Sequence, residues 1–300
     1  MHGGKREMKP YMWMMDYTPQ EDWIDRQGLL LWLAFTLTEV GAGLYLISLF
    51  FDFWGGCVAG WLISAILGGG LHMLYLGKPM RAWRAVLHPV KSELSRGLIF
   101  MGLFLGFGVL HLAPFLIGGL PWTSGGLFFK VIMTILCFFV ITHGFMTMNV
   151  MSSIPFWNSS ILPVLSLASG IWLGTQLGSV MNGEVWIGVE AVARWTLFAY
   201  AFMTIFYFWN AHHSTTAVKE SLRVIVKGEL SSLFYVGVVL IGLIIPLVIT
   251  MVFWVKGPGE MYGVLFLRFI CAFIGDLTLR YLISKAGRYS PLVYSNVAPG

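Results

Sequence analysis

Residues 28–52 read GLLLWLAFTLTEVGAGLYLISLFFD, an apolar stretch interrupted before its last residue only by the charge of Glu39. About 20 consecutive apolar residues are enough for a helix to cross a lipid bilayer. Seven further apolar stretches follow along the chain, at residues 56–77, 97–118, 125–150, 160–180, 186–209, 232–255 and 260–283. This pattern predicts an all-α integral membrane protein with eight transmembrane helices.

The composition excludes an ordinary soluble domain. Apolar residues make up 57% of the 300-residue chain and charged residues only 11%, whereas a soluble domain carries about a quarter charged residues. The net charge of +5 is no sign of nucleic-acid binding, because the basic residues gather on one side of the predicted spans. Thirteen Trp and eleven Tyr suit the aromatic belts at the two membrane interfaces.

The loop charges predict the orientation of the chain. With eight spans, both termini and every second loop share one side, and that side holds fourteen basic residues: Lys5, Arg6, Lys9, Arg26, Lys78, Arg81, Arg84, Lys91, Arg96, Lys219, Arg223, Lys227, Lys285 and Arg288. The opposite side holds only Lys256. Cytoplasmic loops carry the excess of Lys and Arg, so we expect both termini to be cytoplasmic. Residues 1–27 are polar and show no secretory signal, so a cytoplasmic N-terminal arm is expected.

Small residues recur four positions apart at Gly56/Gly60, at Gly102/Gly106 and at Gly170/Gly174/Gly178. This spacing lets helix backbones approach closely within a membrane. It predicts a compact bundle and says nothing about chemistry.

The cysteine and histidine patterns argue against metal cofactors in this chain. Cys57, Cys137 and Cys271 show no CxxC spacing, and a four-iron cluster needs four thiolates. A b-type haem needs two axial ligands at one depth, for which only His72 and His143 qualify, because His111 lies near the opposite end of its span. We therefore expect no metal site, no iron–sulfur cluster and no haem, with a single haem as the less favoured alternative.

Glu39 is the first candidate functional residue. It lies eleven positions into its stretch, hence about 16 Å deep at 1.5 Å per residue. Gly41 and Gly43 follow, leaving room for a close helix or a flat ligand. We interpret Glu39 as a proton acceptor beside a redox or transport site. The alternative is a neutral, hydrogen-bonded carboxylic acid with a structural role.

His72 and His143 are both expected in the cytoplasmic half of the membrane. An imidazole accepts or donates a proton near neutral pH, which suits quinone chemistry, where two electrons move with two protons. The alternative is that each ring is simply satisfied by a hydrogen bond inside the bundle.

Two pairs of ionisable residues lie one helical turn apart in the second half of the chain. Glu190 and Arg194 share a helix face and can pair, as can Asp276 and Arg280. Each pair is either a neutralised structural ion pair, which we favour slightly, or part of a proton route.

Several stretches carry a family resemblance. Residues 71–97 read LHMLYLGKPMRAWRAVLHPVKSELSRG and resemble a segment of the polysulfide reductase membrane-subunit family, the NrfD-like proteins. Further similarity lies in IPFWNS at 154–159, in KGEL at 227–230 followed by Phe234 and by GLIIP at 242–246, and in Leu279-Arg280-Tyr281 with Ala286-Gly287. The resemblance covers nearly the whole chain and agrees on eight spans.

This resemblance implies two packed four-helix bundles in a prokaryotic cytoplasmic (inner) membrane. Residues 28–150 would form the first bundle with a quinone site, 151–159 a connecting loop, 160–283 the second bundle and 284–300 a cytoplasmic tail. Such subunits exchange electrons between a membrane quinone, often menaquinone, and a ferredoxin-like iron–sulfur subunit. That partner connects in turn to a molybdopterin or tungstopterin catalytic subunit, or to a multihaem cytochrome.

The resemblance also implies site residues. His72 matches the histidine of the family's second span, and His143 stands where many relatives have a tyrosine. Glu39 and His143 are the expected groups for proton exchange with quinone, and Glu39 takes a role that some relatives give to polar residues earlier in the first span. Arg81 and Arg84 would lie at the pocket edge or hold the partner subunit, unless they serve only as positive-inside anchors.

The expected function is therefore the quinone-reactive membrane subunit of a respiratory oxidoreductase, without a metal centre of its own. A proton-coupled transporter is the main alternative, but it should show broken helices in paired halves, and the sequence shows none. A purely structural membrane anchor is the third interpretation.

Overall fold

The computed structural model describes residues 14, 16–20, 23–25, 27–118, 120, 126–182, 187–256 and 262–291. Most of the predicted arm 1–27 and residues 292–300 of the predicted tail lie outside this part of the chain. The described residues form helices and their connections, and the one strand-like pairing among them is a bridge between Pro19 and Arg288.

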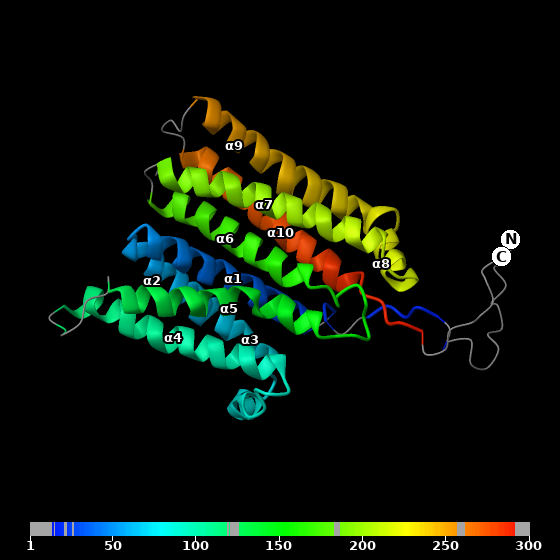
Figure 1. Cartoon of the computed structure of the whole chain (residues 1–300), viewed down its shortest axis with the longest axis horizontal. Coiled ribbons are helices and arrows are strands. Elements are labelled where there is room, and N and C mark those ends of the chain that lie inside the picture. Colours follow the sequence, from blue (N-terminus) through cyan, green and yellow to red (C-terminus); the bar gives the residue numbers. More distant parts are fainter. Residues whose placement is uncertain are drawn as a thin grey trace.

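The helices follow one another with short connections (Figure 1). The α-helices are α1 (Gly28–Phe50), α2 (Trp54–Leu62), α3 (Gly69–Tyr75), α4 (Glu93–Ile117), α5 (Leu127–Asn149), α6 (Ile161–Asn182), α7 (Ile187–His212), α8 (Thr216–Val226), α9 (Ile245–Lys256) and α10 (Tyr262–Lys285). Two π-helical segments, η2 (Ile63–Gly68) and η4 (Leu233–Ile244), continue into α3 and α9, and η3 (Pro79–Val86) is a 3-10 helix.

Seven helical runs in the described chain are long and apolar enough to cross a membrane: Gly28–Phe50, Trp54–Tyr75, Glu93–Ile117, Leu127–Asn149, Ile161–Asn182, Gly188–His212 and Leu233–Trp254. The all-helical, multi-pass membrane architecture is therefore confirmed. The expected count of eight is not, because α10 is equally long but carries Arg268, Asp276 and Arg280. Its composition alone does not mark it as a span.

α1 occupies the centre of the molecule. It packs against α2, η2, α3 and α5 on one side and against α6 on the other, while α6 also packs against α7 and α10. In Figure 1 the helices α1–α5 lie together in the lower half and α6–α10 in the upper half, with α1 beside α6. One apolar cluster surrounds Tyr45 and Phe104. A second surrounds Trp157 and Trp172.

Glycines permit the close contact between α1 and α6. A Cβ atom at Gly43 would collide with the backbone of Gly170, and one at Gly174 would collide with the backbone of Gly43. The close helix packing predicted from the glycine spacing is thus present at Gly170 and Gly174, and also at Gly60, where a Cβ would collide with the α1 backbone. It is absent at Gly102 and Gly106, where a Cβ would have nothing within 4 Å. The contact between α1 and α6 joins the first half of the chain to the second at mid-helix.

The chain segments before α1 and after α10 are tied together at one end of the molecule. The Gln20 N–H donates to the Gly287 carbonyl over 3.0 Å, and the Trp157 indole N–H donates to the Ile283 carbonyl over 2.8 Å. The Lys285 ammonium pairs with the Asp25 carboxylate at 2.9 Å. These contacts hold the segment before α1 and the loop after α5 against the C-terminal end of α10.

Candidate functional site

An apolar cavity of about 210 Å³ lies between α1, α3, α4 and α5. Since a single water molecule needs roughly 10–15 Å³ on this measure, the cavity accommodates a much larger molecule. It is lined by Thr38, Gly69, His72, Met73, Gly97, Leu98, Met101, Gly102, Leu105, Val140 and His143. The lining is almost wholly apolar and carries three polar side chains, a pattern typical of sites for small apolar ligands.

His72 reaches the cavity from α3, directly after the π-helical segment η2. Its Nδ1 lies 2.9 Å from the Gly68 carbonyl oxygen. A carbonyl only accepts, so Nδ1 must donate, and in the neutral ring Nε2 then remains as an acceptor. Wide π-turns inside α-helices often occur at functional sites, and here the π-turn supplies the carbonyl that orients the ring.

His143 reaches the same cavity from α5. Its ring lies directly against the Cα of Gly97 on α4, where any Cβ atom would overlap the imidazole. Within the described part of the chain the ring makes no hydrogen bond, so both ring nitrogens are available to a ligand. The missing side chain of Gly97 therefore leaves the space that the His143 ring occupies.

Phe35 and Thr38 of α1 complete the site. The Phe35 ring meets both imidazoles edge-on, with ring centres 5.0 Å from His72 and 5.5 Å from His143. The Thr38 hydroxyl is buried and has no hydrogen-bond partner among the described residues. The hydroxyl lies against Gly68 of η2, where a Cβ atom would overlap it, so it packs against the helix instead of opening to the cavity. Sequence reasoning missed Phe35, Thr38 and Gly97 as lining or positioning groups.

Glu39 does not line this cavity. It follows Thr38 on α1, and its buried carboxyl turns to α6 and α10, where Oε1 receives a hydrogen bond from the Arg280 guanidinium. Its Oε2 lies 2.6 Å from the Ser166 hydroxyl oxygen, which also lies 2.6 Å from the Ile141 carbonyl oxygen. Ser166 has one proton, so it can donate to only one of these two oxygens.

Arg280 joins Glu39 to a second buried carboxylate. The predicted pairing of Asp276 with Arg280 is present, with 2.6 Å between Arg280 Nε and Asp276 Oδ2. The Ser169 hydroxyl donates to Asp276 Oδ1 over 2.7 Å and accepts from Arg280 over 3.1 Å. One guanidinium and two carboxyl groups thus share a buried cluster between α1, α6 and α10. The link to Glu39 joins residues 241 positions apart, which no local pattern announces.

The expected pairing of Glu190 with Arg194 is wrong. Glu190 instead receives two hydrogen bonds from the fully buried Arg268 of α10, at 2.7 and 2.9 Å. The two N–H groups of the Arg268 guanidinium bond the two carboxylate oxygens of Glu190 in parallel, which is a strong geometry. Arg194, one turn away on the same helix, makes no such bonds to Glu190. The Arg194 guanidinium lies over the Trp254 ring, 4.4 Å from its centre.

Arg81 and Arg84 are exposed on η3 and do not line the histidine cavity. His111 lies apart from it as well, buried against Tyr45, whose hydroxyl is 2.5 Å from the His111 Nδ1. The structure therefore brings His72 and His143 together, and places Glu39, Asp276 and Arg280 in a neighbouring cluster.

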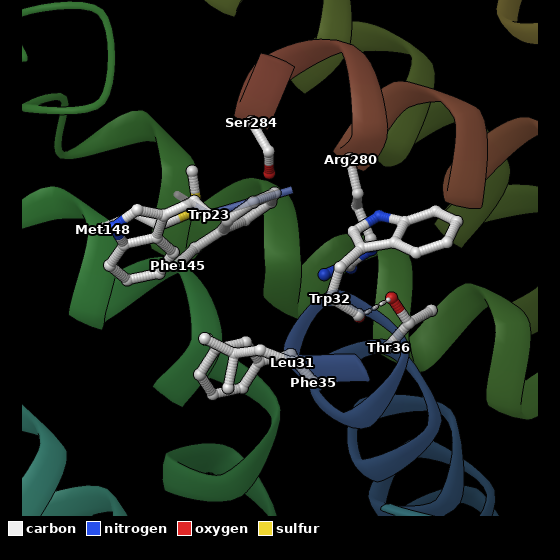
Figure 2. A pocket seen from close by; sticks show the side chains of 10 residues that line it. Trp23, Leu31, Trp32, Phe35, Thr36, Phe145, Met148, Arg280 and Ser284 are labelled. Carbon is white, nitrogen blue, oxygen red and sulfur yellow. Dashed lines mark hydrogen bonds between the residues drawn. The ribbon is translucent and has the colours of Figure 1, made fainter. Parts of the chain in front are cut away.

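A small second cavity adjoins Arg280 (Figure 2). Its volume is about 20 Å³, room for one or two water molecules. Figure 2 shows Arg280 and Ser284 reaching from α10 towards Trp32 and Thr36 of α1. Phe35 lines this small cavity, and its ring also contacts the imidazoles of His72 and His143.

Comparison with known proteins adds no assignment to this geometry. No family model matches the chain, and no curated protein sequence matches it significantly.

Proposed function

We propose that this chain is the quinone-reactive membrane subunit of a multi-subunit respiratory oxidoreductase. The observation that carries the proposal is the apolar cavity onto which His72 and His143 converge from two different helices. A bound quinone would supply a two-electron, two-proton redox couple. The cavity suits such a ligand because its walls are apolar and its polar groups are few.

The polar residues of the cavity can hydrogen-bond the oxygens of a quinone head and exchange protons with them. Nε2 of His72 and the ring nitrogens of His143 can each hold an oxygen of the ligand head or its proton. Because a neutral imidazole accepts and an imidazolium donates, the two histidines can take or deliver one proton each. In the family that the sequence resembles, the quinone is often menaquinone.

The hydrogen bonds around Glu39 support a stored proton. If Oε2 of Glu39 carries a proton, it donates to the Ser166 hydroxyl, which then donates to the Ile141 carbonyl, and both 2.6 Å contacts are satisfied. The cluster is then neutral, with Arg280 balanced by Asp276. We assign Glu39 as a proton-holding group that exchanges with the histidine cavity, from which it is one residue removed along α1.

The same cluster is the candidate proton path. Asp276 and Arg280 extend it from Glu39 into α10, and the water-sized cavity beside Arg280 and Ser284 adjoins it. Glu190 and Arg194, predicted for the same path, lie on α7 and contact Arg268 and Trp254 instead. A role of Glu190 and Arg194 in a proton path therefore stays a prediction from the sequence.

The proposal includes eight spans in two four-helix bundles, with α10 as the eighth. Its charged side chains are paired inside the protein, Arg268 with Glu190 and Arg280 with Glu39 and Asp276. Paired and inward-facing ionisable residues are tolerated within a membrane. An even number of spans puts both termini on one side, and the excess of basic residues in the loops of that side supports the cytoplasmic side. The family resemblance implies a prokaryotic inner membrane.

The partners proposed with this function are a ferredoxin-like iron–sulfur subunit and, beyond it, a molybdopterin or tungstopterin catalytic subunit or a multihaem cytochrome. The chain itself is proposed to hold no haem and no cluster. The sequence resemblance supports these partners.

A titration of the purified, detergent-solubilised chain with a fluorescent quinol-analogue inhibitor tests the proposal. We expect saturable binding that His143→Phe weakens roughly fivefold, since one lost hydrogen bond costs about 1 kcal/mol. His213→Phe is the matched control, because His213 is exposed and outside the cavity. Glu39→Gln should leave binding intact and slow quinol oxidation in the assembled enzyme.

Absence of saturable binding to the folded chain, with the partner subunits present, would leave the transporter or the structural anchor as the better interpretation. A transporter of the broken-helix type needs unwound segments. The π-helical segments η2 and η4 each continue directly into an α-helix, so neither is such a break.

A further inference from the structure

The short helix η3 exposes apolar and basic side chains together. With three residues per turn in a 3-10 helix, Met80 and Trp83 lie on one stripe, and Arg81 and Arg84 lie on the next. Met80 is 88% exposed and Trp83 59% exposed. Beyond the helix Leu87 and Val90 are exposed as well. The third stripe, Ala82 and Ala85, is half-buried towards the bundle.

This exposed surface is held in place. The Ser95 hydroxyl donates to the Ala85 carbonyl, and the Arg96 Nε donates to the Pro89 carbonyl over 2.9 Å. Both donors belong to the first turn of α4, so the segment is fixed against the end of a membrane-spanning helix. Figure 1 shows η3 as the short cyan helix beyond α3, at a steep angle to the long helices.

A second surface helix shows what is unusual about η3. The helix α8 also carries exposed basic residues, Lys219 and Arg223, but its apolar residues are buried or half-buried in the protein. The apolar side chains of η3 have no such cover among the described residues. Within the described part of the chain, Met80 and Trp83 are therefore left exposed.

We propose that residues 78–91, with η3 at their centre, lie in the headgroup layer of the membrane and bind anionic lipid. The segment links the ends of two spans, which places it at the depth of the interface. Trp and Met beside Lys and Arg match the composition of interfacial amphipathic segments. Lys78, Arg81, Arg84 and Lys91 supply the positive charge that attracts anionic headgroups.

Spin labelling at Met80→Cys in lipid nanodiscs tests the proposal, because Cys57, Cys137 and Cys271 are buried and less reactive to the label. In nanodiscs rich in anionic lipid, we expect the label to be reached by oxygen and shielded from a water-soluble nickel chelate. Arg81→Gln with Arg84→Gln should lower the ratio of docked to undocked segment roughly 30-fold, at about 1 kcal/mol per basic residue near the surface.

The matched control is Lys219→Gln with Arg223→Gln on α8, which removes the same charge without changing the shielding at residue 80. A label that stays accessible to the nickel chelate in every lipid overturns the proposal. Shielding of the same extent in neutral and anionic lipid, and with or without Arg81 and Arg84, also overturns it. Shielding that arises only when partner subunits are added overturns it in favour of a protein contact.

Discussion

The buried cluster around Arg280 predicts that its two carboxyl groups tolerate neutralisation very differently. Asp276 is the partner that balances the Arg280 charge, and Glu39 is assigned a proton. In Asp276→Asn the guanidinium is left buried without its counter-charge. In Glu39→Gln one neutral group replaces another of nearly the same shape, and the amide NH₂ can still donate to the Ser166 hydroxyl.

The magnitudes follow from the burial of all three groups, whose side chains are 2–4% exposed. Removing one partner of a buried ion pair costs about 3–5 kcal/mol, because an uncompensated charge remains. A change that keeps a neutral hydrogen-bonding group costs about 1 kcal/mol. We therefore expect Asp276→Asn to destabilise the protein several times more than Glu39→Gln.

The assay is equilibrium unfolding of the solubilised protein by a denaturing detergent, followed by circular dichroism. Asp276→Asn combined with Arg280→Met removes both charges, and this double variant should be more stable than Asp276→Asn alone. Glu220→Gln serves as the control, since its pairing with Arg223 is long, 3.8 Å, and partly exposed. Equal losses for Glu39→Gln and Asp276→Asn would refute the assigned proton.

Two further predictions concern the cavity and the second buried ion pair. Gly97→Ala should displace the His143 ring and weaken quinol-analogue binding roughly tenfold, because its Cβ would overlap the imidazole; the inhibitor titration measures this. Glu190→Gln should destabilise the protein by about 3–5 kcal/mol, because Arg268 is then buried without its carboxylate; detergent-induced unfolding measures this loss.

Each of these changes has a control in the same chain. Gly106→Ala, on the same helix as Gly97, adds a Cβ with nothing within 4 Å and should leave binding unchanged. Arg194→Met removes a charge that lies near Glu190 in sequence but contacts the Trp254 ring, and should cost less than Glu190→Gln. Comparable effects in a variant and its control would show that the contact in question does not decide the property measured.

Where the helices lie was largely predictable from the sequence. The first span was predicted at 28–52 and is Gly28–Phe50, and the fourth was predicted at 125–150 and is Leu127–Asn149. Apolar length is a local property, since each span must satisfy its own backbone within the lipid. The one-turn spacing of Asp276 and Arg280 correctly predicted their pairing, but the same spacing wrongly predicted that of Glu190 and Arg194.

Which side chains meet between helices was decided only by the tertiary structure. Glu39 was predicted beside a quinone site, yet its carboxyl faces Arg280, while its neighbour Thr38 lines the cavity with His72 and His143. Glu190 forms its ion pair with Arg268 of another helix and not with Arg194 of its own helix. Successive residues on a helix point about 100° apart, so the rotation of α1 between its neighbours decides which of two adjacent residues enters the site. That rotation depends on contacts such as Gly43 with Gly170, formed between segments far apart along the chain.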